Sequence, residues 1–299
     1  LNGDDPRVLA MRLLSDARAY TYGSAESVDM RFFDVKQTGA TGIAFRFASR
    51  WGDGECALAT PGLAEDLEDR TEAPYAAMFG DTIAADEAKA RFAAALIVTR
   101  RPAFMTLHLI SLDDAQHGHG PSAPEAYAVL ARIDAAVGGL VAAARQAEPD
   151  LVVAVASDHG FAKVEHDVHL KALFAAEGLL TLNADKTAVT AWDAAPWSAG
   201  GTAAVVLARP EDTGLRAKVA GVLAKLKARP DLGIAEVIDQ AEVAARGGAK
   251  EAAFFVNFKF GYESGDALDG APVTKSGAKG MHGYFPDAPE MREIGRAHV

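Results

Sequence analysis

Carboxylates and imidazoles follow two apolar runs of this 299-residue chain. The run Ala103–Ile110 is followed by SLDDAQHGHGP, which contains Asp113 and His117. A second apolar run, LVVAVA, is followed by SDHGF, which contains Asp158 and His159. Carboxylate oxygens and imidazole nitrogens are ligands that suit zinc or a similar divalent ion. These residue types raise the hypothesis of a metal centre.

A third histidine, His282 in GMHGY, follows a glycine-rich stretch that lets the backbone reach a distant site. Each group alone has an ordinary interpretation, because DDAQH is typical of a surface loop and SDHG of a turn capped by Asp158. Their occurrence together in one chain favours a metal centre. The single cysteine, Cys56, cannot build a thiolate cage or an internal disulfide, so such a centre must use His, Asp or Glu.

Helical and strand-like patterns alternate around these motifs. DEAKARFAAALIVTRR predicts a helix from Asp86, and AFMTLHLI after it predicts a short buried strand of the parallel type. Ser122 with Glu125 forms a capping-box pattern that opens a helix of about six turns. LVVAVA predicts the next strand. Because ligands collect outside the carboxyl ends of parallel strands, both acid–histidine groups are expected at one shared site.

The alternation continues toward the end of the chain, and it indicates the α/β fold class. Leu170 and Phe174 mark a helix that stops near Gly178, and His166 and His169 are expected at the start of that helix. Residues 1–50 show no interpretable pattern. We predict strands at 202–208 and 252–258, a helix at 211–229, and insertions or loops at about 180–201 and 261–280.

The order of the motifs resembles the nucleotide pyrophosphatase/phosphodiesterase (type I phosphodiesterase) branch of the alkaline phosphatase superfamily. The resemblance covers about Thr60 to Arg292, and the segments ATPGL and FGD are similar to its bacterial members. The matching residues are Asp113, His117, Gly120 and Pro121; Ser157, Asp158, His159 and Gly160; and Gly280, His282, Gly283, Tyr284, Pro289, Glu290 and Met291.

The resemblance implies an alkaline-phosphatase-like sandwich with a mostly parallel central sheet flanked by helices. It also implies two zinc ions, one held by Asp113, His117 and His282 and the other bound in part by Asp158 and His159. The family further needs an early Asp ligand and a Thr or Ser nucleophile that becomes phosphorylated. Neither occurs before Asp113, so we assign no catalytic residue, interpret the chain as a fragment lacking its N-terminal segment, and expect this fragment to be inactive.

The family pattern is not matched at every position. Gln116 stands where glycine is frequent, and Asp114 and His119 offer competing ligands beside Asp113 and His117. We retain Asp113 and His117 because they keep the family's spacing to Gly–Pro.

The function implied by the resemblance is metal-dependent hydrolysis of phosphodiester or nucleotide pyrophosphate bonds in a small phosphoester or nucleotide. The alternatives are a phosphomonoesterase, a phosphonate hydrolase, a sulfatase-like relative, or a non-catalytic protein that binds metal or phosphate. The net charge of −11 argues against a protein that follows a nucleic-acid backbone. The sequence gives no oligomeric state.

The sequence gives little information on the cellular location of the protein. We see no uninterrupted apolar stretch of the roughly 18 to 20 residues that span a bilayer, and LNGDDPRVLA lacks the pattern of a signal peptide. Localisation is therefore undetermined, and only the resemblance favours the periplasm or secretion. Glu293–Val299 (EIGRAHV) matches the translation of common sequencing-adapter DNA, so we interpret residues 1–292 as a partial catalytic domain and 293–299 as an artefact.

Overall fold

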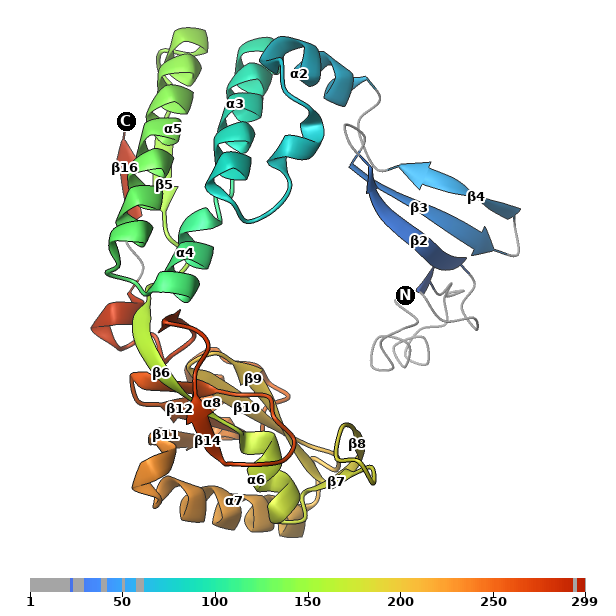
Figure 1. Cartoon of the computed structure of the whole chain (residues 1–299), viewed down its shortest axis with the longest axis vertical. Coiled ribbons are helices and arrows are strands. Elements are labelled where there is room, and N and C mark those ends of the chain that lie inside the picture. Colours follow the sequence, from blue (N-terminus) through green and yellow to red (C-terminus); the bar gives the residue numbers. More distant parts are fainter. Residues whose placement is uncertain are drawn as a thin grey trace. The chain divides into compact units, whose positions relative to one another are not determined.

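The structure, a computed structural model of the 299-residue chain, describes residues 62–292 and the backbone of five strands outside that range. Those strands are β1 (Tyr22–Gly23), β2 (Met30–Thr38), β3 (Gly42–Ser49), β4 (Gly52–Ala57) and β16 (Gly295–His298). The chain forms two compact units. The first comprises Leu1–Ile110 and Arg132–Leu151, and the second comprises Ser111–Ala131 and Val152–Val299. Figure 1 labels most of their elements.

The first unit contains a sheet of order β1-β2-β3-β4 and the helices α2 (Leu63–Thr71), α3 (Ile83–Arg100) and most of α5 (Pro124–Ala147). The predicted helix at 86–101 is confirmed as α3, which begins three residues earlier. It begins there because Oγ1 of Thr82 accepts a hydrogen bond from the backbone N–H of Ala85, which satisfies a donor of the first turn. The long helix predicted after Ser122 is confirmed as α5.

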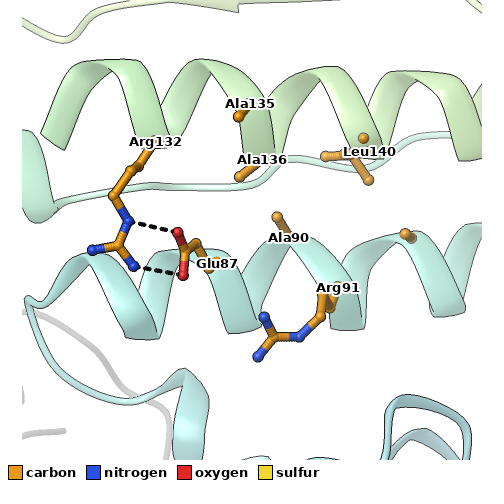
Figure 2. A pocket seen from close by; sticks show the side chains of 9 residues that line it. Glu87, Ala90, Arg91, Arg132, Ala135, Ala136 and Leu140 are labelled. Carbon is orange, nitrogen blue, oxygen red and sulfur yellow. Dashed lines mark hydrogen bonds and ion pairs between the residues drawn. The ribbon is translucent and has the colours of Figure 1, made fainter. Parts of the chain in front are cut away.

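A groove of about 420 Å³ runs between α3 and α5 of the first unit (Figure 2). Nε and Nη2 of Arg132 on α5 each donate a hydrogen bond to the carboxylate of Glu87 on α3, at 2.8 Å. The hydrogen bond from Arg132 lowers the pKa of Glu87. This two-point pairing bridges the two helices across a groove lined mostly by small residues. Its lining comprises Glu87, Ala90, Arg91, Ala94, Arg132, Ala135, Ala136, Gly139 and Leu140.

The helix α5 is long and apolar enough to cross a membrane by length and composition, with a mean hydropathy of 1.5 over its most apolar window, of which 6% is buried. The sequence prediction rested on uninterrupted apolar runs alone and therefore did not identify α5 as a candidate span. Arg132 and Asp134 lie near the middle of the helix, however, and charges at the centre of a bilayer are costly. The pairing of Arg132 with Glu87 favours a helix that packs against protein.

The run Ala103–Ile110 was predicted to be a strand, and the structure contradicts this, since no strand is formed there. A strand needs a neighbour for its backbone hydrogen bonds, and none of the described segments pairs with this run. The side chain of Phe104 is accordingly exposed. The other predicted strand, LVVAVA, is confirmed as β5 (Val153–Ala156), which pairs antiparallel with β16.

The second unit combines helices with two larger sheets and thereby confirms the α/β class. One sheet has the order β11-β12-β10-β9, and the other has the order β13-β6-β14 with β15 also paired to β6. Its helices are α4 (Ser111–His119), α6 (Leu170–Ala176), α7 (Thr213–Lys227) and α8 (Gln240–Ala245). Besides β5 and β16, its strands are β6 (Ala162–Val168), β7 (Leu180–Leu182), β8 (Val189–Trp192), β9 (Ala194–Ala199), β10 (Thr202–Leu207), β11 (Ile234–Asp239), β12 (Phe254–Phe258), β13 (Gly261–Ser264), β14 (Val273–Lys275) and β15 (Gly280–Met281).

The core of the second unit lies between α7 and the sheet that contains β10. Val219 of α7, Val205 of β10 and Val256 of β12 are fully buried within one apolar cluster. Asp212 caps α7, because its Oδ1 accepts a hydrogen bond of 2.8 Å from the N–H of Leu215. The predictions of α6, α7, β10 and β12 are all confirmed. This packed layer is the platform on which the glycine turn between β9 and β10 is built.

Several expectations for the second unit need correction. Segments 180–201 and 261–280 contain strands β7 to β9 and β13 to β15, so they are not irregular loops. His166 lies in β6 and not at the start of α6, whereas His169 is the N-cap residue of α6, as expected. Among the described pairings only β1–β2 and β13–β6 are parallel, whereas a mostly parallel sheet was expected. The two apolar runs expected at the centre of that sheet find no parallel neighbour in the described residues.

Candidate metal centre

Asp113 and His117 lie on one face of the helix α4. The segment was predicted to be a loop, but residues 111–119 form a helix in which Ser111 and Ala115 are buried. Residues four apart on a helix are neighbours, so the two side chains meet. Nε2 of His117 lies 3.5 Å from Oδ2 of Asp113. The helix thus presents a carboxylate and an imidazole as a ready pair.

The strand β6 brings the other two motifs to this pair. Asp158 and His159 lie in the turn between β5 and β6, and His282 follows β15, which pairs antiparallel with the start of β6. The rings of His159 and His282 stack with centroids 3.8 Å apart. Nε2 of His282 lies 3.5 Å and Nε2 of His159 lies 3.8 Å from Oδ1 of Asp113. With Oδ2 of Asp158 at 3.5 Å from Nε2 of His159, the structure brings all five predicted residues together.

The spacing of these atoms fits a metal ion better than direct hydrogen bonds. Separations of 3.5 to 3.8 Å are long for hydrogen bonds between nitrogen and oxygen. Two ligands bonded at about 2.1 Å to a tetrahedral zinc ion lie roughly 3.4 Å apart. Ligand atoms of Asp113, His117 and His282 all lie within 4.8 Å of one another. Oδ1 of Asp113 is buried and accepts no hydrogen bond from the described residues, which is the environment of an atom that serves a cation.

The histidines are oriented by backbone carbonyl groups. Nδ1 of His117 lies 2.9 Å from the carbonyl oxygen of Gly280, and Nδ1 of His159 lies 3.2 Å from that of Gly160. A hydrogen on Nδ1 satisfies each carbonyl and leaves the Nε2 lone pair facing Asp113, as in metal sites where a second group fixes the tautomer. Burial, followed by the neighbouring His159, lowers the pKa of His282. The lowered pKa favours the neutral form of His282, whose ring nitrogen can then donate to a metal.

Sequence reasoning missed Phe161, which packs against all three histidine rings. Its ring centroid lies 4.8 Å from that of His117, 5.2 Å from that of His282 and 5.6 Å from that of His159. An apolar ring in this place shields the imidazoles from water on one side and limits their rotation. The only signal in the sequence is that Phe161 directly follows SDHG.

The alternative ligands on α4 do not join the group. Asp114 and His119 are both exposed, whereas Asp113 and His117 are about one third exposed and face His282. Among the described residues, the group that could hold a metal ion comprises Asp113, His117 and His282. The groove between α3 and α5 belongs to the first unit, while every residue of the candidate metal centre belongs to the second.

Comparison with known families decides the affiliation of the chain. The family model described as type I phosphodiesterase / nucleotide pyrophosphatase matches residues 35–284. The chain belongs to this family. Type I phosphodiesterases are metal-dependent hydrolases of phosphoester bonds, which agrees with the resemblance inferred from the motifs. A search of curated proteins gave no match.

Two solved structures share the fold at low sequence identity, and a third matches more weakly. Human ectonucleotide pyrophosphatase/phosphodiesterase 5 matches with a TM-score of 0.51 and 19% identity, over 71% of this chain and 52% of that chain. An inactive variant of the murine protein, in complex with AMP, matches with a TM-score of 0.51 and 18% identity over the same shares. Phosphonoacetate hydrolase from Sinorhizobium meliloti 1021 has a TM-score of 0.48 and 16% identity, over 72% of this chain and 52% of that chain. The chain spans about half the length of these proteins.

Proposed function

We propose that the protein containing this chain hydrolyses phosphodiester or nucleotide pyrophosphate bonds at a centre with two zinc ions. The observation that carries the proposal is the gathering of His117 and His282 around Asp113, whose buried Oδ1 accepts no hydrogen bond from the described residues. Family membership supplies the reaction class. The AMP bound to the murine relative supports a nucleotide as substrate.

The five residues would divide between the two ions. Asp113, His117 and His282 would hold one ion, which gives it three protein ligands. Asp158 and His159 would contribute two ligands to the other, fewer than the three usual at catalytic zinc sites, so a further ligand has to come from elsewhere in the protein. When bound, zinc supplies positive charge that polarises a phosphoryl oxygen and stabilises charge developing in the transition state.

The side chains of this chain would prepare the centre before substrate arrives. The carbonyl groups of Gly280 and Gly160 hold the protons of His117 and His159 on Nδ1, away from the reacting phosphate. Phe161 excludes water from one side of the rings. None of these residues carries a hydroxyl group, so the Thr or Ser nucleophile expected for the family has to lie outside this cluster, and we propose that the 299-residue chain alone has little turnover.

The test is the activity of the whole protein on bis-p-nitrophenyl phosphate and on p-nitrophenyl phosphate, after chelation and after addition of zinc. We expect hydrolysis to be lost on chelation, restored by zinc and faster for the diester. The control variant Glu251→Gln, which changes an exposed glutamate of the turn before β12, should respond to chelation and zinc as the unmodified protein does. Faster hydrolysis of the monoester would point to a phosphomonoesterase. Two bound zinc ions without turnover of either substrate would indicate a binding protein.

A further inference from the structure

The backbone at His282 is held by the glycine turn between β9 and β10. The N–H of Gly201 donates a hydrogen bond of 2.8 Å to the carbonyl of His282. The approach is so close that a Cβ on Gly283 would lie 2.1 Å from the carbonyl oxygen of Ala199. Gly200 adopts φ +69° in this turn, which a glycine does without strain. The turn therefore touches the residues on both sides of the His282 carbonyl.

Tyr284 forms the other side of this contact. Its side chain is buried, and the space above its ring is filled by the backbone of Gly201, where an added Cβ would lie 2.3 to 2.5 Å from three ring carbons. The ring has little room to retreat. Its hydroxyl donates a hydrogen bond of 2.8 Å to the carbonyl of Tyr262 on β13, and Phe260 packs edge-on at 4.9 Å between centroids.

The strand β13 fixes both partners of the contact. Besides receiving the hydroxyl of Tyr284, it donates a hydrogen bond of 2.9 Å from the N–H of Ser264 to the carbonyl of Gly200. Turn and tyrosine are thus anchored to one strand, and the segment between them carries the imidazole that faces Asp113. A methyl group inserted between the turn and the ring must push one of them away, and His282 and Gly283, which contact the turn and directly precede Tyr284, would shift with it.

We propose that Gly201 and Tyr284 are positioning residues that hold the imidazole of His282 against Asp113 and thereby set the metal affinity of the centre. The inference rests on the proposed function only in taking the ligand to be a divalent metal. Gly201 is required for space, because its φ lies outside the left-handed region and alanine could adopt it. Tyr284 is required as a ring of fixed place, with its hydroxyl as the anchor.

Zinc titration of the 299-residue chain measures the effect directly. We expect Gly201→Ala to weaken zinc binding about 10- to 100-fold, the loss typical when a group that orients a metal ligand is removed. Gly221→Ala is the matched control, because a Cβ at Gly221 in α7 meets no atom within 4 Å. Tyr284→Ala should weaken binding as well. Combining Gly201→Ala with Tyr284→Ala should lower the zinc affinity little further, because the ring that the added methyl group would contact is absent.

A second measurement needs no metal. The stacked rings of His159 and His282 should give nuclear Overhauser effects between their ring protons in the metal-free chain, and Gly201→Ala should abolish them while Gly221→Ala does not. If the unmodified chain binds no zinc, the proposed metal centre fails, whereas the ring contact still decides the positioning. Equal zinc affinity and an intact ring contact in Gly201→Ala would overturn it. If Gly201→Ala does not fold, Tyr284→Phe, which keeps the ring but lacks the hydroxyl, takes its place. Unchanged zinc affinity and an intact ring contact in Tyr284→Phe would then overturn the proposed positioning role.

Discussion

Replacing Glu263 by glutamine should remove a pH-dependent weakness of the second unit. Glu263 on β13 is 7% exposed and lies opposite Asp167 of β6 in the parallel register. Its Oε1 accepts a hydrogen bond of 2.6 Å from the hydroxyl of Ser276. Burial, together with the neighbouring carboxyl of Asp167, raises the pKa of Glu263 from 4.5 to about 7. The folded protein therefore keeps this group neutral over a range in which the unfolded chain ionises it.

The sign and size of the effect follow from this difference in pKa. Because the folded state binds the proton more tightly, the stabilising contribution is complete below pH 4.5 and is lost as pH rises through about 7. The difference corresponds to roughly 3 kcal/mol, at about 1.4 kcal/mol per pH unit. Glutamine has a similar shape, can still accept from Ser276 and cannot ionise. Glu263→Gln should thus stabilise the second unit by up to roughly 3 kcal/mol at pH 8 and change it little near pH 4.5.

Urea unfolding followed by tryptophan fluorescence can measure this difference. Trp192 and Trp197 lie in the second unit, and the remaining tryptophan, Trp51, belongs to the first. A Trp51→Phe background therefore makes the signal specific for the second unit. Glu251→Gln, an exposed glutamate of the same unit, is the control and should behave alike at both pH values. If Glu263→Gln shifts the free energy of unfolding equally at pH 4.5 and pH 8, the reasoning is refuted.

Three further changes test the candidate centre and the first unit. His282→Ala in the whole protein should lower kcat by on the order of 10² to 10⁴, partly recovered by excess zinc, because one of three ligands to an ion that stabilises the transition state is lost; zinc content by elemental analysis that stays at two per chain would contradict this. Asp113→Asn should abolish tight zinc binding in calorimetric titration but leave the circular dichroism spectrum unchanged, since the amide keeps the shape without the charge. Arg132→Gln should change the melting temperature by little, because its pairing with Glu87 is solvent-exposed; a large fall would show that the pair holds α5 in place.

The long helices were predictable because each carries its own signal. In α5 and α7 apolar residues recur at helical spacing over many turns, and this pattern does not depend on the rest of the chain. The strand prediction for Ala103–Ile110 was wrong for the opposite reason, because a strand depends on pairing with a neighbour that its own residues do not encode. The helix α4 was missed because Gly118 and the polar residues around it are typical of loops.

In the candidate centre, too, some residues could be predicted from the sequence and others could not. Asp113, His117 and His282 could be nominated from residue type and motif order, and the structure brings them together. Their supports could not be nominated, because Gly201 and Tyr284 act through close contacts of backbone and ring between segments about 80 residues apart. Such contacts leave no periodic pattern in the sequence. The ligands of a site are therefore easier to predict than the groups that orient them.

The strand β5 has one described neighbour, β16, whose residues Gly295 to His298 pair with Ala156 to Val153. Gly295 to His298 belong to the segment interpreted as an artefact, and a chain without that segment would leave this apolar strand, with Val155 half exposed, without any neighbour among the described residues. Open strand edges with apolar side chains pair readily with the edges of other molecules. The shortened chain is therefore expected to self-associate through the open edge of β5.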